Sequence, residues 1–170
     1  MAEVTVYYLE INDRAAHRAT PPRPALTVAE AQVKQGKVNR FLYDLIGEPW
    51  QWYEKRDWTI AQWEAYTGDD QLRTFIAYVQ GSIAGYFELR KIDSDTELAY
   101  FGLAPAFVGQ GLGSAFLSQA IDAAWDWPKT QRVIVNTCSL DHPSALGNYK
   151  KRGFVVYDEK TITYDGPNEA

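Results

Sequence analysis

Three glycines alternate along one short stretch of the chain, and this spacing is typical of a loop that binds phosphate. The stretch reads Val108-Gly109-Gln110-Gly111-Leu112-Gly113-Ser114 and lies between a predicted strand and a predicted helix. Glycines let the backbone approach an anion without a clashing Cβ, and the first turn of a helix directs its N–H groups at the same point. We therefore expect this loop to hold a phosphorylated ligand.

The residues around the loop argue against two common phosphate-binding motifs. A P-loop ends in Gly-Lys-Ser/Thr, whereas this loop continues with Gly113, Ser114 and Ala115. A dinucleotide fingerprint is spaced Gly-x-Gly-x-x-Gly and usually belongs to the first β-α-β unit. Here the spacing is Gly-x-Gly-x-Gly and the loop comes late in the chain, so an unrelated nucleotide-binding domain is disfavoured.

The elements that must position this loop are predicted from apolar periodicity and turn residues. Apolar residues at 38, 41, 42, 45 and 46 form one face of a helix, and Thr59 with Gln62 forms a capping box. The Gln80-Gly81 pair is typical of a hairpin turn. We expect strands over 4–11, 73–79, 82–91, 97–103 and 132–137, an antiparallel pair over 154–157 and 160–164, and helices over 38–46, 59–66, 112–125 and 144–152. This order indicates a mixed α/β domain on one largely antiparallel sheet.

Composition narrows the class of protein further. The 170 residues suit one domain, and a net charge of −5 argues against nucleic acid as a main partner. Cys138 is the only cysteine, so neither an intrachain disulfide nor a cysteine-based metal site is expected. The sequence has no signal-peptide pattern and no apolar run of the roughly 20 residues that cross a bilayer. We expect a cytoplasmic protein with no membrane partner and no metal.

Two motifs together resemble the GNAT superfamily of acetyl-CoA-dependent acyltransferases. The family's pyrophosphate motif, Arg/Gln-x-x-Gly-x-Gly/Ala after an aliphatic-x-Pro, corresponds to Leu103-Ala104-Pro105 followed by Val108 to Gly113, with Val108 in place of Arg or Gln. The family's Asn-x-x-Ala-x-x-x-Tyr-x-x-x-Gly-Phe ending corresponds to His142 through Phe154, with His142 in place of Asn. In this second motif the four matching residues are Ala145, Tyr149, Gly153 and Phe154.

The resemblance implies a GNAT fold, in which a mostly antiparallel sheet has splayed central strands flanked by helices. It also implies one domain over 1–170, with an acceptor-side region over about 1–70 and an acetyl-CoA-binding core over about 71–164. Acetyl-CoA would lie in the gap between the splayed strands. Its expected contacts are Phe101, Gly102, Leu103, Val108, Gly109, Gln110, Gly111, Gly113, Ser114, His142 and Ala145.

The resemblance also indicates which residues carry the chemistry. Acyl transfer to an amine needs a proton acceptor for the ammonium and a proton donor for the departing thiolate. Tyr149 matches the family position that faces the sulfur, so we expect it to be the acid. Glu97, in the strand before the phosphate loop, is the candidate base, and we expect it to share a face with Ala99 and Phe101. Water-assisted deprotonation and His142 are alternatives, although His142 also suits capping of the next helix.

Aromatic residues gather in the region that covers the acceptor pocket in this superfamily. We expect Trp50, Trp52, Tyr53 and Trp58 to contact the acceptor, because aromatic faces bind cations and apolar groups. Core packing is the alternative for any one of them.

Two functions remain open from the sequence. The first is an N-acetyltransferase acting on a primary amine of a small molecule, peptide or protein through a ternary complex, as a monomer or homodimer. The second is a non-catalytic acyl-CoA-binding domain on the same fold, which the departures at Val108 and His142 keep open.

Overall fold

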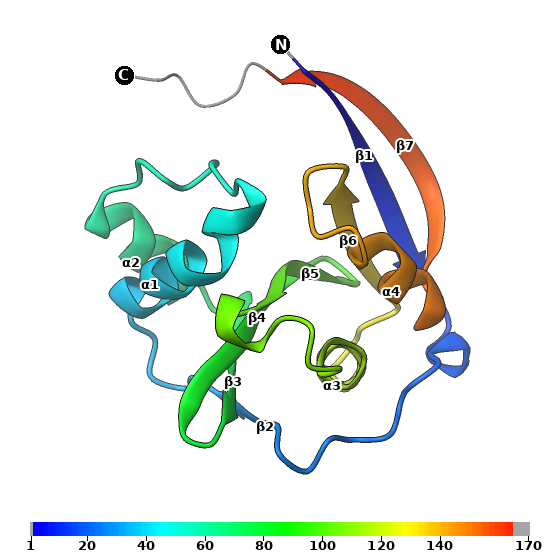
Figure 1. Ribbon diagram of the computed structural model, residues 1–170, viewed down its shortest axis with the longest axis horizontal. Helices are drawn as coiled ribbons and strands as arrows, with labels where there is room; N and C mark the ends of the chain where they lie inside the picture. Colours follow the sequence, from blue (N-terminus) through cyan, green and yellow to red (C-terminus); the bar gives the residue numbers. More distant parts are fainter. Residues whose placement is uncertain (1, 165–170) are drawn as a thin grey trace.

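A seven-stranded sheet runs through the computed structural model, which describes residues 2–164 of the chain (Figure 1). The strand order is β2-β3-β4-β5-β6-β1-β7. The strands are β1 (Ala2–Ile11), β2 (Thr27–Glu30), β3 (Leu72–Val79), β4 (Ser82–Ile92), β5 (Asp95–Leu103), β6 (Arg132–Cys138) and β7 (Val155–Tyr164). The helices are α1 (Gly36–Gly47), α2 (Ile60–Gly68), α3 (Gly113–Asp126) and α4 (Ala145–Lys151). Short 3-10 turns are η1 (Arg14–Ala16), η2 (Glu48–Trp50) and η3 (Pro105–Phe107).

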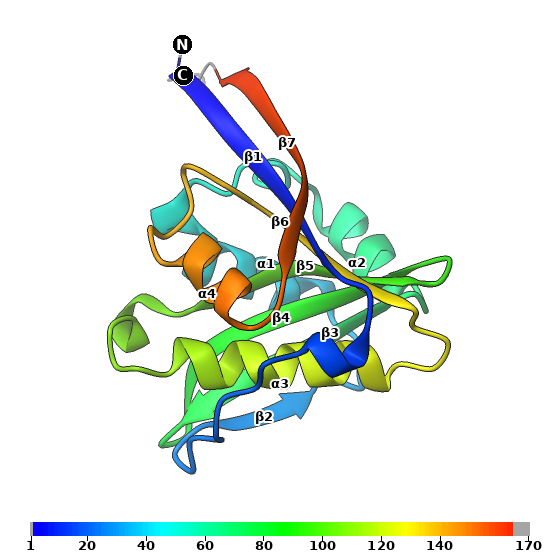
Figure 2. The same cartoon turned by 90° about the vertical axis from the view of Figure 1, so that its right-hand side faces the viewer.

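The helices cover the two faces of the sheet separately (Figure 2). On one face, the apolar side of α3 packs on β4 and β5, where Phe116 contacts Phe87 and Phe101. On the other face, Leu42 and Ile46 of α1 are fully buried with residues of β3 and β4. The predicted α1 stripe is buried in part, since Leu42 and Ile46 are fully buried but Phe41 at its edge is 52% exposed. The predicted capping box of Thr59 and Gln62 is present at the start of α2.

The centre of the sheet is open at one end, because β5 and β6 pair over a short stretch. Their parallel pairing joins Asp95 to Arg132, Thr96 to Val133 and Glu97 to Ile134, and it stops there. Beyond Glu97 the two strands diverge, while each stays paired on its other side, β5 with β4 and β6 with β1. The expected splay of the central strands is confirmed.

A bulge in β5 changes which side chains share a face. Leu98 pairs with Leu89 and Tyr100 with Glu88, so Ala99 has no partner on β4. The extra residue reverses the alternation of side chains beyond it. As a result Glu97 and Phe101 lie on opposite faces, and the expectation that they share one is wrong.

The last strand also differs from the expectation. Residues 155–164 form one strand, β7, which pairs antiparallel with β1 along its whole length, rather than a hairpin of two strands. The strand contains a bulge, where Tyr8 pairs with Asp158 and Leu9 with Val156. The ten-residue strand β1 offers a partner along the whole of this segment, so pairing with a remote strand replaces the expected local pair. Strand β2, which pairs with β3, was not expected at all.

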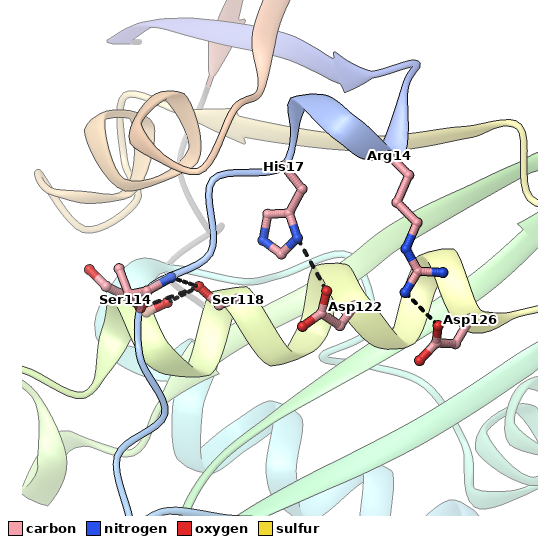
Figure 3. Close-up of polar contacts among 7 residues, drawn as sticks. Arg14, His17, Ser114, Ser118, Asp122 and Asp126 are labelled. Atoms are coloured by element: carbon pink, nitrogen blue, oxygen red, sulfur yellow. Dashed lines mark hydrogen bonds and ion pairs between the residues drawn. The ribbon is translucent and has the colours of Figure 1, made fainter.

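Between β1 and β2 the chain runs along α3 as a strap, defined here as residues 14–26 (Figure 3). Arg14 forms an ion pair with Asp126 (Nη2–Oδ1 2.7 Å), and His17 Nδ1 lies 3.2 Å from an oxygen of Asp122. The Thr20 N–H donates to Ser118 Oγ at 2.9 Å. The α3 partners recur every four residues, so they lie along one side of the helix. The strap is thereby led from the end of β1 towards the start of α3.

Candidate active site

A cavity of about 1050 Å³ occupies the gap between the splayed strands. Its walls come from β1, β5, β6, α4 and the glycine-rich loop, and the segment after α1 adds Trp50, Trp52 and Tyr53. A cavity of this volume is large enough for a cofactor-sized ligand. The structure thus brings most of the predicted cofactor contacts to one cavity: Phe101, Gly102, Leu103, Val108, Gly109, Gly111, Gly113, Ser114, His142 and Ala145.

The glycine-rich loop has the backbone conformation of an anion cradle. Gly109 and Gly111 have φ of +81° and +73°, values that side chains rarely allow. No side chain caps the start of α3, so the first-turn N–H groups and the positive end of the helix dipole remain directed at this end of the cavity. These features fit the pyrophosphate of acetyl-CoA.

Gln110 does not join the cradle. It is exposed and lies outside the cavity lining, and its amide donates to the Ala106 carbonyl at 2.9 Å. The expectation that it contacts the cofactor has no support in this arrangement.

Two cations that were not expected lie close to the cavity or line it. The Arg23 guanidinium, carried there by the strap, lies 3.4 Å from the place where a Cβ on Gly111 would sit. Lys151, at the end of α4, also lines the cavity. The region before residue 24 is rich in proline and carries no motif, so no local pattern indicates that Arg23 meets the loop.

The glycine in β5 has a packing reason. A Cβ on Gly102 would come within 2.6 Å of a methyl carbon of Ile46 on α1. The bulge in this strand is at Ala99, and the close neighbour of Gly102 on this side is α1. The adjacent Phe101 and Leu103 face α3 and also line the cavity.

Tyr149 lies at the cavity wall, with its ring held between two others. It is 6% exposed and meets Phe101 and Phe154 at centroid distances of 6.4 and 5.7 Å, edge-on in both cases. Burial raises the pKa of Tyr149, so its hydroxyl stays protonated at neutral pH. A phenol in this state can donate a proton and does not act as a base.

Glu97 lies on the face of the sheet that α1 and α2 cover. Its cross-strand partner is Arg90, and the two side chains form an ion pair with Arg90 Nη2 3.2 Å from Glu97 Oε1. Glu97 is not among the residues that line the cavity. It lies on the same face as Tyr100, which does line the cavity, because of the bulge at Ala99.

His142 and Trp50 close part of the cavity together. Their rings meet edge-on with centroids 4.9 Å apart, and both line the cavity. His142 Nδ1 accepts the N–H of Ser144, the residue that precedes α4. This contact uses one imidazole nitrogen in the turn before α4, but it does not cap the helix, because no side chain among residues 2–164 accepts from the first-turn N–H groups of α4.

The other aromatic residues fall into two groups. Trp52 and Tyr53 line the cavity, and Tyr53 stacks on Tyr164 at 5.6 Å. Trp58 lies outside the lining and packs edge-on against the buried Trp63 at 5.3 Å. The four predicted acceptor residues are therefore split between the cavity and its outer flank.

Residues 2–164 contain no group of three His, Cys, Asp or Glu side chains placed to hold a metal ion. None of the helices in this part of the chain is long and apolar enough to cross a membrane.

The family model described as acetyltransferase (GNAT) family matches residues 39–154. No curated protein matches the chain. Among solved structures, a GCN5-related N-acetyltransferase from Sphaerobacter thermophilus has a TM-score of 0.71 at 13% identity, covering 93% of this chain and 50% of its own. A functionally unknown conserved protein from Staphylococcus epidermidis has a TM-score of 0.69 at 19% identity, covering 94% and 60%.

A third solved structure is also similar to this chain. A mutant of the spermidine N-acetyltransferase of Vibrio cholerae has a TM-score of 0.60 at 20% identity, covering 78% of this chain and 81% of its own. At these identities the likeness concerns the fold. The chain spans between 50% and 60% of the length of the Sphaerobacter and Staphylococcus proteins.

Proposed function

Because the chain belongs to the GNAT acetyltransferase family, we propose that it is an N-acetyltransferase that transfers an acetyl group from acetyl-CoA to a primary amine. The acceptor is an amine of a small molecule or peptide, and both substrates bind before transfer. The proposal treats residues 1–170 as one catalytic domain. Its acceptor-side region, about 1–70, also supplies β1 residues and Arg23 around the cavity.

One observation supports the proposal above the others: the cavity between the splayed strands is lined both by the glycine-rich loop and by the buried Tyr149. Gly109, Gly111 and Tyr149 all line this one cavity. The cradle would hold the pyrophosphate through backbone N–H groups, and Arg23 and Lys151 would add positive charge. The unpaired part of β5 offers main-chain groups to the pantetheine amides.

Acetyl-CoA supplies an activated thioester, and the residues of the chain move the protons. Tyr149 donates a proton to the thiolate as the carbon–sulfur bond breaks, since burial keeps its hydroxyl protonated. The acceptor ammonium loses its proton to Glu97, through water, or directly to water. Glu97 lies next to the bulge, on the face of the sheet that α1 and α2 cover. To accept a proton it must give up its ion pair with Arg90.

The first test is thiol release from acetyl-CoA in the presence of amines, amino acids and peptides. Thermal unfolding with acetyl-CoA, NAD or ATP accompanies it, because a ligand that binds the folded state raises Tm by mass action. We expect acetyl-CoA to raise Tm far more than NAD or ATP. Acetyl-CoA binding without thiol release for any amine would favour the non-catalytic alternative, and a shift with NAD alone would contradict the proposal.

A matched pair of glycine variants tests the cradle. Gly109 and Gly81 both have positive φ, +81° and +76°, and neither has an atom within 4 Å of an added Cβ. Gly109→Glu and Gly81→Glu therefore carry similar backbone strain, but Gly81 belongs to the β3–β4 hairpin turn. Gly109→Glu should lose the acetyl-CoA shift because its charge repels phosphate, and Gly81→Glu should keep it. An equal shift in both variants would remove the loop from the binding site.

A further inference from the structure

The ammonium of Lys55 lies among aromatic rings on the face of the sheet that α1 and α2 cover. The cage is defined here as Trp58, Tyr66 and Tyr100. Lys55 Nζ is 4.7 Å from the centroid of the Trp58 ring and 4.9 Å from each of the other two. It also donates to the Tyr100 hydroxyl at 2.9 Å. The Trp58 and Tyr66 rings and the hydroxyl edge of Tyr100 surround one nitrogen, and aromatic rings placed around a cation in this way bind organic ammonium groups in proteins.

The surroundings of the cage favour positive charge. Tyr66 donates its hydroxyl proton to Glu88 at 2.6 Å, and Tyr100 donates to Glu54 at 2.7 Å. Glu88 is fully buried, whereas Glu54 is exposed. Lys55 takes part in none of the ion pairs found among residues 2–164. The ring faces and one hydroxyl hold its ammonium, and the carboxylates act from behind the rings.

The cage adjoins the cavity between the splayed strands. Tyr100 of the cage lines the cavity, and so does Glu54, which accepts the Tyr100 hydroxyl proton. Tyr100 follows the bulge at Ala99, and the residues after it line the gap where the thioester is proposed to lie. Tyr100 therefore separates the cavity from the cage. A molecule whose amine lies in the cavity would have to reach past Tyr100 to place a second cation in the cage.

Lys55 is a costly occupant of this position. It belongs to residues 51–59, which contain neither helix nor strand, whereas Tyr66 and Tyr100 belong to α2 and β5. Burial lowers the pKa of Lys55, because the ammonium loses water that the cage does not replace. A more weakly hydrated alkylammonium would lose less on entering the same cage.

We propose that the cage of Trp58, Tyr66 and Tyr100 is a binding site for an alkylammonium group of the acceptor, and that Lys55 is a built-in occupant which the acceptor displaces. The acceptor class is then an amine that carries a second, fixed positive charge. The link to an acceptor rests on the proposed acetyl transfer, whereas the cage and its occupant can be tested without acetyl-CoA.

The test uses choline as a cation that cannot be acetylated on nitrogen, and 3,3-dimethyl-1-butanol as its uncharged isostere. Lys55→Ala empties the cage, so choline should raise its Tm with half-maximal effect at a concentration about tenfold or more below that for the wild type. The uncharged isostere should have little effect on either protein. Lys37→Ala, which removes an exposed lysine of α1, should respond as the wild type does.

A folded Lys55→Ala protein that responds equally to choline and to the isostere, or to neither, would overturn the proposal. Should Lys55→Ala fail to fold, Lys55→Met retains the stem packing and should still respond to choline more strongly than the wild type; an unchanged response would overturn it too. In the thiol-release assay, choline should raise the KM of a diamine acceptor without changing kcat. Choline binding without any thiol release would leave the cage site intact and defeat only the proposed reaction.

Discussion

At the scale of single residues, the sharpest expectation concerns Tyr149. Tyr149→Phe keeps the packing against Phe101 and Phe154 but removes the proton donor. If this hydroxyl protonates the leaving thiolate, kcat should fall by about 10²–10⁴-fold while the acetyl-CoA shift in Tm is nearly unchanged. Tyr157→Phe, at an exposed tyrosine of β7, is the matched control and should match the wild type. An unchanged kcat with chemistry rate-limiting would exclude Tyr149.

Glu97 is the proposed base, and its ion pair with Arg90 opposes that role. As a base it would make kcat/KM rise with pH through an ionisation that Glu97→Gln removes. Deprotonation of the free amine gives a second limb, generally at higher pH, which the variant should keep. A wild-type pH profile in Glu97→Gln would leave water as the better account, since His142 already uses Nδ1 in the turn before α4.

Arg23 is expected to contribute to cofactor affinity although it lies far from the motif in sequence. Arg23→Gln should raise the KM for acetyl-CoA by about tenfold, the effect of losing one charge-assisted contact of about 1.4 kcal/mol. The dependence of that KM on salt should also weaken. Arg40→Gln, at an exposed arginine of α1, should alter neither property. Equal KM values for the Arg23 and Arg40 variants would contradict this role.

At the scale of elements, the strap should make stability depend on acid. The His17 side chain is 5% exposed, and burial lowers its pKa more than the nearby Asp122 raises it. The unfolded chain then takes up a proton at higher pH than the folded one, so stability should fall as pH drops below about 6.5. His17→Gln should reduce the loss of Tm between about pH 7.5 and pH 5.5. An identical loss in the variant would mean that His17 does not control it.

Which elements the sequence predicts depends on how local their causes are. Helix α1, the capping box of α2 and the glycine-rich loop each depend on residues within a few positions, and all three are present. The single strand β7, the bulge at Ala99 and the position of Arg23 depend on partners distant in the chain. In these cases pairing and packing between remote segments decide the outcome, so local patterns cannot reveal them.

The candidate site likewise has parts that local sequence predicts and parts that depend on remote segments. Backbone conformation at Gly109 and Gly111 follows from residue type, so the cradle is predictable from the motif. The face of the sheet on which Glu97 lies is not predictable from the sequence. The unpaired Ala99 reverses the alternation of side chains between Glu97 and Phe101. The cage around Lys55 joins β5, α2 and the loop before α2, and no sequence pattern connects these three.

At the scale of the whole molecule, the segment before residue 39 completes a site whose motifs all come later. The family match begins at residue 39, yet Val4, Val6 and Tyr8 of β1 form part of the cavity wall and the strap brings Arg23 to the loop. We therefore expect ligand binding to be coupled to the docking of residues 2–26. Acetyl-CoA should slow amide hydrogen exchange in β1 and the strap, besides the glycine-rich loop that it is proposed to contact. Exchange slowed at the loop alone would contradict this linkage. If the coupling holds, part of the measured affinity for acetyl-CoA comes from the free energy with which the N-terminal segment docks on the rest of the domain.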